Sequence, residues 1–339
     1  MADLNYDFAR ALSLVVEPVD FKQQPVDFIV EEELRFELTG AGEHLYILIE
    51  KEQQNTHWCA KQIARWANVP NRHVSFAGLK DRQGVTRQWF SIWLPGKPDP
   101  EGPLEIEGVS VIDQRRHRAK LQRGALSSNR FHIVLRGVQG NLGEIEEGLT
   151  RIAAKGVPNY FGPQRFGVDH GNVTLALGRP AQEWLEQNRA NDIYVSAVRS
   201  YLFNSLLHHR ILQDNWSVPQ VGEPLILSGS NSWFVAEGTD DELIRIEQGD
   251  CSTSGVMYSG PTVLDESPAF SLIELELLHS YAELTDWLTP LQLKPLRRPL
   301  ILRPNQLQWT FLDNHTLSLS FGLPSGTYAT SVLRELFSF

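Results

Sequence analysis

The chain has 339 residues, of which 42% are hydrophobic and 21% charged, and its formal net charge is −10. This length suits one large domain or two of ordinary size, and the composition predicts a packed globular protein and excludes a disordered one. Two cysteines cannot form a disulfide framework or a cysteine-rich zinc site. No stretch approaches the length of a membrane span, and the first residues lack a secretory signal pattern. We therefore expect a cytoplasmic protein with no membrane association.

The charge is unevenly distributed. Residues 115–130 contain six Lys or Arg and no acid, whereas residues 237–286 contain twelve acids and one Arg. The net charge argues against a nucleic-acid partner, but the basic run could still bind a polyanion. A solvated charged surface explains the run equally well. The candidate nucleic-acid contacts are Arg115, Arg116, Arg118, Lys120 and Arg123, together with Lys80.

Alternating apolar residues predict a strand over 26–38, interrupted on its apolar side by Glu32, and a second strand over 43–51. Glycines between them predict that the two strands form a hairpin. A helix is predicted from Thr56, as its N-cap, to Asn68, where the following Val-Pro stops it.

The segment 75–93, S-F-A-G-L-K-D-R-Q-G-V-T-R-Q-W-F-S-I-W, is predicted to be a tight loop followed by an aromatic strand. Asp81 lies between Lys80 and Arg82, and neighbouring positive charge favours the ionised carboxylate. Such an aspartate could serve as a nucleophile or a general base. A solvated charged turn is the commoner reading of these residues taken alone.

Further strands are predicted over 104–112 and 130–136, with the basic run between them, and a helix over 141–155. The glycine-rich, aromatic block 158–167 and a long helix over 192–214 follow. Strands return over 299–302, 307–312 and 316–321, before a last helix over 330–337. Strand-rich ends around a different middle predict an inserted domain at 156–302, while the outer pieces share one sheet with packed helices in an α+β layout.

Several kinds of site are disfavoured. His208 and His209 are adjacent and would diverge on a helix, and no zinc, P-loop, dinucleotide or serine-elbow motif is present. What remains includes Asn129 and Phe131 at the end of the basic run. Their plain interpretation is a turn residue and a core residue. The functional interpretation is that Phe131 stacks on an unstacked base while Asn129 hydrogen-bonds its edge.

Three motifs together resemble the TruD family of tRNA pseudouridine synthases, and the likeness covers essentially the whole chain. They are A-G-L-K-D at 77–81, V-P-N-Y-F-G-P-Q-R-F-G at 157–167 and L-P-S-G-T-Y-A-T-S-V-L-R-E-L at 323–336. The resemblance implies isomerisation of uridine to pseudouridine in tRNA, at position 13 in bacterial members, without a metal or an organic cofactor. It also implies the pseudouridine synthase fold, which is a mixed, mainly antiparallel sheet with flanking helices, together with an inserted second α+β domain. The catalytic domain is then expected at 1–155 and 303–339, and the inserted TRUD domain at 156–302. We expect a monomer.

The family's functional positions can be placed on this sequence. The resemblance implies that Asp81 is the active aspartate. The substrate-contacting positions match Phe28, Asn129 and Tyr328, the basic residue matches Lys22, and the stacking aromatic matches Phe131. Tyr328 stands where close bacterial relatives have phenylalanine, so its hydroxyl needs a partner. Gly84 stands in place of a more usual alanine, which is expected to loosen the loop around Asp81.

Two other classes of protein remain as alternatives. One is an RNA-binding module without catalysis, which would rely on the basic run. The other is a carboxylate glycosidase, which needs two paired acids, whereas only Asp81 lies in a motif.

Overall fold

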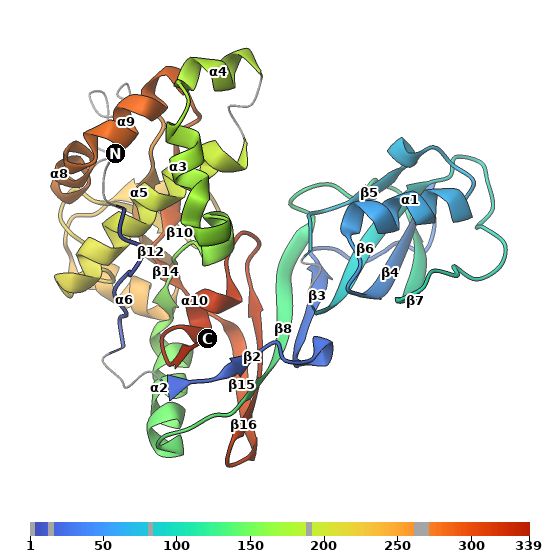
Figure 1. Cartoon of the computed structure of the whole chain (residues 1–339), viewed down its shortest axis with the longest axis horizontal. Coiled ribbons are helices and arrows are strands. Elements are labelled where there is room, and N and C mark those ends of the chain that lie inside the picture. The colour runs from blue at the N-terminus through green and yellow to red at the C-terminus, as the bar shows by residue number, and fades with distance from the viewer. Residues whose placement is uncertain (1–3, 13–16, 81–83, 188–191, 261–270) are drawn as a thin grey trace. The chain divides into compact units, whose positions relative to one another are not determined.

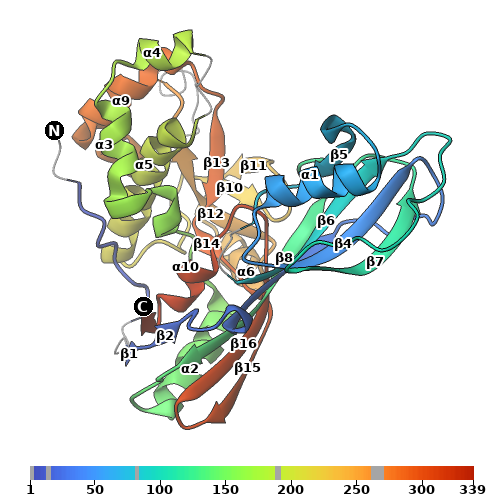
Figure 2. The same ribbon diagram turned by 45° about the vertical axis from the view of Figure 1, so that its right-hand side comes forward.

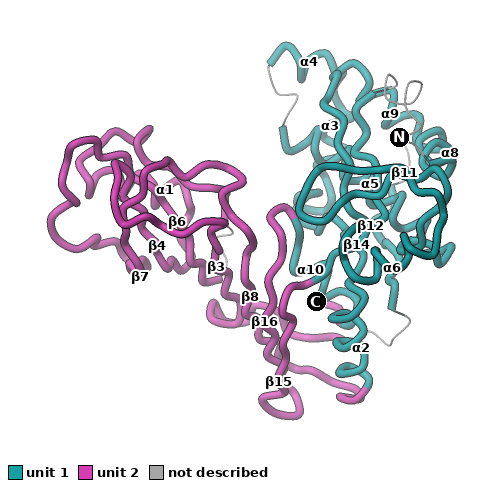
Figure 3. The backbone as a smooth tube through the Cα atoms, turned by 180° about the vertical axis from the view of Figure 1, so that it is seen from behind, with its two compact units in different colours: residues 1–16, 144–303, 327–336 teal, residues 17–143, 304–326, 337–339 magenta. Residues whose placement is uncertain are grey.

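The computed structural model describes residues 4–12, 17–80, 84–187, 192–260 and 271–339 (Figure 1). Asp81 and Arg82 lie outside the described residues. The described chain divides into two compact units, coloured separately in Figure 3. We call residues 17–143, 304–326 and 337–339 the sheet unit, and residues 1–16, 144–303 and 327–336 the middle unit. Within the described residues, no helix is long and apolar enough to cross a membrane.

A nine-stranded sheet forms the centre of the sheet unit. Seven strands follow the order β15-β16-β8-β3-β6-β4-β7, while β2 pairs with β8 and β5 with β6. Of the described pairings in this sheet, β3–β6 is parallel and the others are antiparallel, so the predicted mixed, mainly antiparallel α+β class is confirmed. The strands are β2 (Asp20–Phe21), β3 (Phe28–Leu34), β4 (His44–Glu52), β5 (Val74–Phe76), β6 (Val85–Trp93), β7 (Val109–His117), β8 (Leu126–Arg136), β15 (Asn305–Asp313) and β16 (Thr316–Leu323). Separately, β1 (Glu17–Pro18) pairs with β17 (Phe337–Ser338).

The predicted hairpin between β3 and β4 is wrong. Strand β6 lies between them, and it pairs with β3 in parallel and with β4 in antiparallel register. Trp89, Phe90 and Ser91 in β6 are all buried. A strand buried on both faces belongs in the interior of a sheet, and this explains why β6 separates two strands that are consecutive in the chain.

Helix α1 (Thr56–Trp66) covers one face of this sheet (Figure 2). Its Cys59 and Ile63 are fully buried in a cluster with side chains of β4 and β6. The N-cap is Asn55, whose side-chain oxygen accepts hydrogen bonds from the first turn, rather than the predicted Thr56. Because Asn55 caps the helix, the hydroxyl of Thr56 is available for another contact.

The basic run begins inside a strand. The strand predicted at 104–112 is instead β7, which starts at Val109 and carries Arg115 and Arg116, and β8 starts before the predicted residue 130. The loop between the two strands therefore contains only the middle of the run, with Arg118, Lys120 and Arg123.

In the middle unit, the long helix α5 (Ile193–Leu212) lies in the main hydrophobic core and packs on β12 (Cys251–Met257). Gly255 of β12 permits this approach, because a Cβ atom there would lie 2.9 Å from the Phe203 ring of α5. Strand β12 belongs to a four-stranded sheet with the order β11-β10-β12-β13. The other strands are β9 (Val157–Pro158), β10 (Pro224–Leu227), β11 (Trp233–Val235), β13 (Leu296–Pro299) and β14 (Ile301–Leu302). The other helices are α2 (Leu142–Lys155), α3 (Gly171–Leu177), α4 (Ala181–Glu186), α6 (Asp240–Gln248), α8 (Leu272–Ser280), α9 (Ala282–Leu288) and α10 (Ala329–Leu333).

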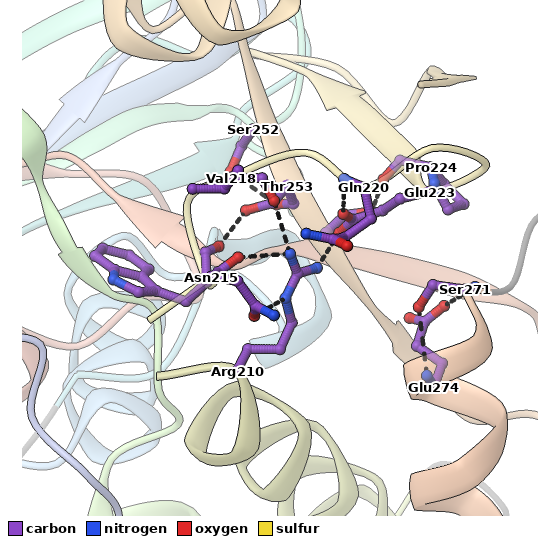
Figure 4. A network of polar contacts seen from close by, with 12 residues as sticks. Arg210, Asn215, Val218, Gln220, Glu223, Pro224, Ser252, Thr253, Ser271 and Glu274 are labelled. Atoms are coloured by element: carbon purple, nitrogen blue, oxygen red, sulfur yellow. Dashed lines mark hydrogen bonds and ion pairs between the residues drawn. The ribbon is translucent and has the colours of Figure 1, made fainter. Parts of the chain in front are cut away.

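Buried polar contacts hold the end of α5 (Figure 4). Arg210 forms an ion pair with Glu223, and both side chains are at most 2% exposed. The same guanidinium donates to the backbone oxygens of Asn215 and Val218, at 2.6 and 2.9 Å. These bonds offset the cost of removing a charge from water, so that the chain leaving α5 is fixed to the core.

The compact units differ in extent from the predicted domains. Residues 1–16, most of α2 and residues 327–336 group with the middle unit. In the N-terminal segment, Tyr6 stacks on His170 and Phe8 on Tyr160. The inserted domain at 156–302 stays a prediction about sequence organisation, and the compact unit is larger than that insert.

Candidate functional site

The residues just before Asp81 are tied to the sheet unit by two buried polar side chains. The backbone N–H of Lys80 donates to the Thr56 hydroxyl at 3.2 Å, and this hydroxyl donates to Oε1 of Gln88 at 3.0 Å. Nε2 of Gln88 donates to the carbonyl of Gly78 at 2.8 Å. Both Thr56 and Gln88 are at most 1% exposed. Helix α1 and strand β6 therefore fix the backbone on the N-terminal side of Asp81.

On the C-terminal side, Gly84 brings the chain close to Phe28. Its φ is 104°, and a Cβ atom at this position would lie 2.6 Å from the Phe28 carbonyl oxygen. From the sequence, Gly84 was expected to loosen the loop around Asp81. In this structure the glycine instead permits a close contact between the start of β6 and β3.

Lys80, Glu32 and Asn129 form a polar cluster next to this loop. The Lys80 ammonium lies 2.8 Å from the Glu32 carboxylate and donates to Oδ1 of Asn129 at 2.7 Å. The Glu32 side chain is fully buried, that of Lys80 is 11% exposed, and Glu32 also accepts the backbone N–H of Trp89. Lys80 was predicted as an RNA contact, but here its ammonium is engaged inside the protein.

Aromatic side chains lie on the same face of the sheet as Asn129. In the register of β3 and β8, Glu32 is opposite Asn129 and Val30 is opposite Phe131, so residues two apart share this face. Phe131 packs between Phe28 and Phe321, with ring centroids 6.0 and 5.7 Å away. Phe131 is 8% exposed, which fits its core interpretation and leaves stacking on a base as a prediction.

Lys22 lies at the edge of the aromatic group. Its ammonium is 3.9 Å from the centroid of the Phe28 ring and 5.1 Å from that of Phe21. A cation over an aromatic face is held by the ring's quadrupole. Lys22 and Phe28, both assigned to the site from the sequence, are therefore in direct contact.

The basic run is only partly available to a polyanion. Arg115 pairs with Asp113 at 3.1 Å, and Arg116 pairs with Asp99 at 2.6 Å. Arg118, Lys120 and Arg123 are exposed, and none of them forms an ion pair within the described residues. These three cations are the stronger candidates for phosphate contacts.

Tyr328 belongs to the middle unit, unlike the other described site candidates. Its hydroxyl accepts hydrogen bonds from Nε and Nη2 of Arg165, at 3.1 and 2.9 Å. The Phe161 ring lies 6.1 Å from the Tyr328 ring in an edge arrangement. The partner that the sequence required for this hydroxyl is thus Arg165, from the aromatic motif at 157–167.

A buried cation, Arg298, contacts two residues of the same motif. Arg298 donates to Oδ1 of Asn159 at 2.6 Å and lies 4.1 Å from the centroid of the Phe161 ring. Burial lowers the pKa of Arg298 to about 10. The Phe161 ring therefore contacts both Arg298 and Tyr328. Through Phe161, the motif at 157–167 forms part of the surroundings of Tyr328.

Sequence reasoning missed several polar residues that support the site. They are Glu32, Thr56, Gln88 and Arg165. Glu32 left a signal, since it interrupts the apolar side of its predicted strand, and a buried charge needs a partner.

Within the described residues, no group of three or more His, Cys, Asp or Glu could hold a metal ion.

Comparison with known proteins identifies the class. The fold is shared with a crystal structure from Methanosarcina mazei described as a tRNA pseudouridine synthase D, with a TM-score of 0.70, 20% identity, and 96% of this chain and 95% of that chain covered. A family model, tRNA pseudouridine synthase D (TruD), matches residues 19–179 and 179–336.

Curated relatives agree in sequence over nearly the whole chain. A tRNA pseudouridine synthase D of Hydrogenovibrio crunogenus is 42% identical, with 97% of this chain and 96% of the relative covered. A second, from Nitrosococcus oceani, is also 42% identical, with 92% and 88% covered. The chain belongs to the tRNA pseudouridine synthase D family.

Proposed function

We propose that the protein isomerises uridine 13 of tRNA to pseudouridine, with Asp81 as the essential carboxylate. The observation that carries this proposal is family membership over almost the full chain, together with the G-L-K-D motif ending at Asp81. Pseudouridine has the same atoms as uridine, so the reaction needs no energy source. We expect it to need no metal or organic cofactor.

Polar contacts and a close backbone approach fix the described residues on either side of Asp81. Thr56 and Gln88 hold the backbone at Gly78 and Lys80, and Gly84 returns the chain beside Phe28. Asp81 lies between these two fixed points in the sequence.

The chemistry proceeds on a uridine that has left the RNA stack. Enzymes that act on a base extrude it into a pocket, and single bases are gripped by stacking and by hydrogen bonds to their edges. Phe28, Phe131 and Tyr328 are proposed to contact the base. Ionised Asp81 attacks C1′ of the ribose, or removes a proton from the ribose, as the bond from C1′ to N1 breaks. The retained base turns and rebonds to C1′ through C5, while the bond to Asp81 breaks or the ribose proton returns. C5 then loses its proton and N1 gains one, so the product has the same atoms as the substrate. Lys22 is proposed to favour the charged form of Asp81.

The exposed cations of the basic run would bind the tRNA backbone. Arg118, Lys120 and Arg123 are exposed on the loop between β7 and β8. Each phosphate contact releases counterions, so binding should weaken steeply as the salt concentration rises. The protein is proposed to act as a monomer in the cytoplasm.

The direct test is to incubate the protein with unmodified tRNA and map pseudouridine along the product. Conversion at position 13, and its absence from a tRNA carrying cytidine there, would support the proposal. Salt-dependent tRNA binding without any conversion of uridine would contradict it and would favour the non-catalytic RNA-binding module.

A further inference from the structure

The cluster of Lys80, Glu32 and Asn129 determines which way the Asn129 amide points. Lysine has three N–H donors and no acceptor, so it can only bind the oxygen end of an amide. The Lys80 ammonium lies 2.7 Å from Oδ1 of Asn129. The orientation of this amide therefore follows from the chemistry of its partner.

Glu32 in turn fixes Lys80. The carboxylate is fully buried, lies 2.8 Å from the ammonium and accepts the Trp89 N–H at 2.9 Å. A buried carboxylate held at both oxygens has little freedom to move. The Nδ2 group of half-buried Asn129 makes no hydrogen bond within the described residues, so its two N–H donors are available to a ligand.

We propose that Glu32 and Lys80 are positioning residues that fix the Asn129 amide with its NH2 group toward the target base, so that it donates to a carbonyl of uracil. This inference rests on the proposed function and names the recognition step within it. Asn129 is then a donor, and not an acceptor from the uracil N3–H.

The geometry of uracil makes a donor useful throughout the reaction. Its two carbonyls, at C2 and C4, are related by the axis through N3 and C6. When the freed base turns about this axis to bring C5 in place of N1, the two carbonyls exchange places. A fixed donor that faces one carbonyl before the turn therefore finds the other afterwards.

The same donor gives selectivity for uracil. Cytosine carries an amino group at C4 in place of a carbonyl. Of the two positions that exchange during the turn, C2 and C4, the second therefore presents a donor to Asn129. Two donors facing each other leave both groups without an acceptor, which is costly in a site closed to water. The ammonium of Lys80 also polarises the amide. This strengthens the hydrogen bonds that the amide N–H groups donate to the base, which gains negative charge when it leaves the ribose.

Asn129→Asp gives the first test. Aspartate keeps an oxygen for Lys80, so the fold is retained, but it replaces the NH2 group by an acceptor. We expect kcat to fall about 100-fold, as on loss of a fixed donor at a site of developing charge. The Kd for tRNA should stay within about twofold, because the phosphate contacts are unchanged. A wild-type kcat would overturn the inference.

Variants at Lys80 test the positioning role. Lys80→Met should lower kcat at least tenfold, whereas Lys80→Arg, which also only donates, should restore most of it. Lys51→Met is the matched control, since Lys51 is 1% exposed in the same sheet unit and donates to the Gln54 carbonyl. It should lose stability while its kcat per folded molecule is unchanged. If Lys80→Met fails to fold, Glu32→Gln with Lys80→Met removes both buried charges and should show the same loss of kcat.

Modified substrates connect the amide to the base. Sulfur accepts hydrogen bonds less well than oxygen, so 2-thiouridine and 4-thiouridine at the target should each slow the wild type, because the two carbonyls exchange. The same substitutions should have little further effect on Asn129→Asp. Equal effects in both proteins would overturn the inference and leave the proposed function intact. A wild type that converts no uridine would instead contradict the proposed function.

Discussion

The side-chain amide of Gln88 in β6 donates to the backbone carbonyl of Gly78 at 2.8 Å. This bond crosses from a buried strand to the loop that precedes Asp81. Thr56 closes the same connection by accepting the Lys80 N–H and donating to Gln88. These bonds hold the backbone of the loop, while the Lys80 side chain contacts Glu32 and Asn129.

Thr56→Val should loosen this loop. Valine has nearly the same shape but leaves the Lys80 N–H and Oε1 of Gln88 without a partner. We expect a loss of about 1–3 kcal/mol in the free energy of unfolding, and a lower kcat. Urea denaturation and single-turnover kinetics measure the two effects. Thr150→Val is the matched control, because that exposed hydroxyl donates only to Glu146 in its own helix. Equal stability losses in the two variants would contradict the anchoring role.

Phe131 is expected to have two roles that its variants can separate. Phe131→Ala should cost about 3–5 kcal/mol of stability, because the ring is buried between Phe28 and Phe321. Phe131→Leu keeps most of the volume but loses base stacking worth about 1–3 kcal/mol. We therefore expect Phe131→Leu to remain folded, with reduced turnover.

The control for Phe131→Leu is Phe90→Leu. Phe90 is fully buried in the core beneath α1. This variant should lose stability but keep its turnover per folded molecule. If the two leucine variants turn over equally well, Phe131 is a core residue only.

Tyr328→Phe should separate the ring from the hydroxyl. The variant removes the acceptor of two Arg165 N–H groups, so we expect a cost of about 1–3 kcal/mol in stability. The ring that is proposed to contact the base remains, so kcat should change by less than about threefold, whereas Tyr328→Ala should lose much more. Loss of turnover in a folded Tyr328→Phe protein would show that the hydroxyl itself acts on the substrate.

Asp27, just before Phe28, should make stability depend on acid. Its carboxylate is 1% exposed and accepts two N–H groups of Arg136, which hold its pKa below the usual 3.8. Because the pKa is lowered in the folded state, its contribution is fully present above about pH 4 and is lost as the pH falls below 3.8 through the folded pKa. The difference in unfolding free energy between wild type and Asp27→Asn should therefore shrink over that range. A pH-independent difference would contradict this assignment.

Local patterns predicted much of the fold. The apolar spacing of α2 and the apolar composition of α5 located these two helices, and alternation located β3, β4 and β16. The pairing of β3 with β6 could not be read locally, because it brings together strands with β4 and α1 between them in the chain. The N-cap is Asn55 and not the predicted Thr56. Both residue types are good caps, and in the structure the threonine hydroxyl forms tertiary contacts instead.

The candidate site was predicted less completely. Motif resemblance placed Lys22 and Phe28, which the structure brings into contact. The contact of Lys80 with RNA stays a prediction. In the structure its ammonium contacts Glu32 and Asn129, which lie 48 and 49 positions away in the sequence. Only the register of β3 against β8 places those two residues opposite each other. Buried ion pairs of this kind depend on long-range register and leave little trace in a single sequence.

The measurement that tests the central claim most directly compares wild type with Asp81→Asn on unmodified tRNA, with pseudouridine mapped and tRNA affinity measured in the same buffer. Asparagine keeps the size of the side chain but removes its charge. We predict that the variant forms no pseudouridine at position 13 and binds tRNA as the wild type does. Pseudouridine formed at the wild-type rate by Asp81→Asn would contradict the account.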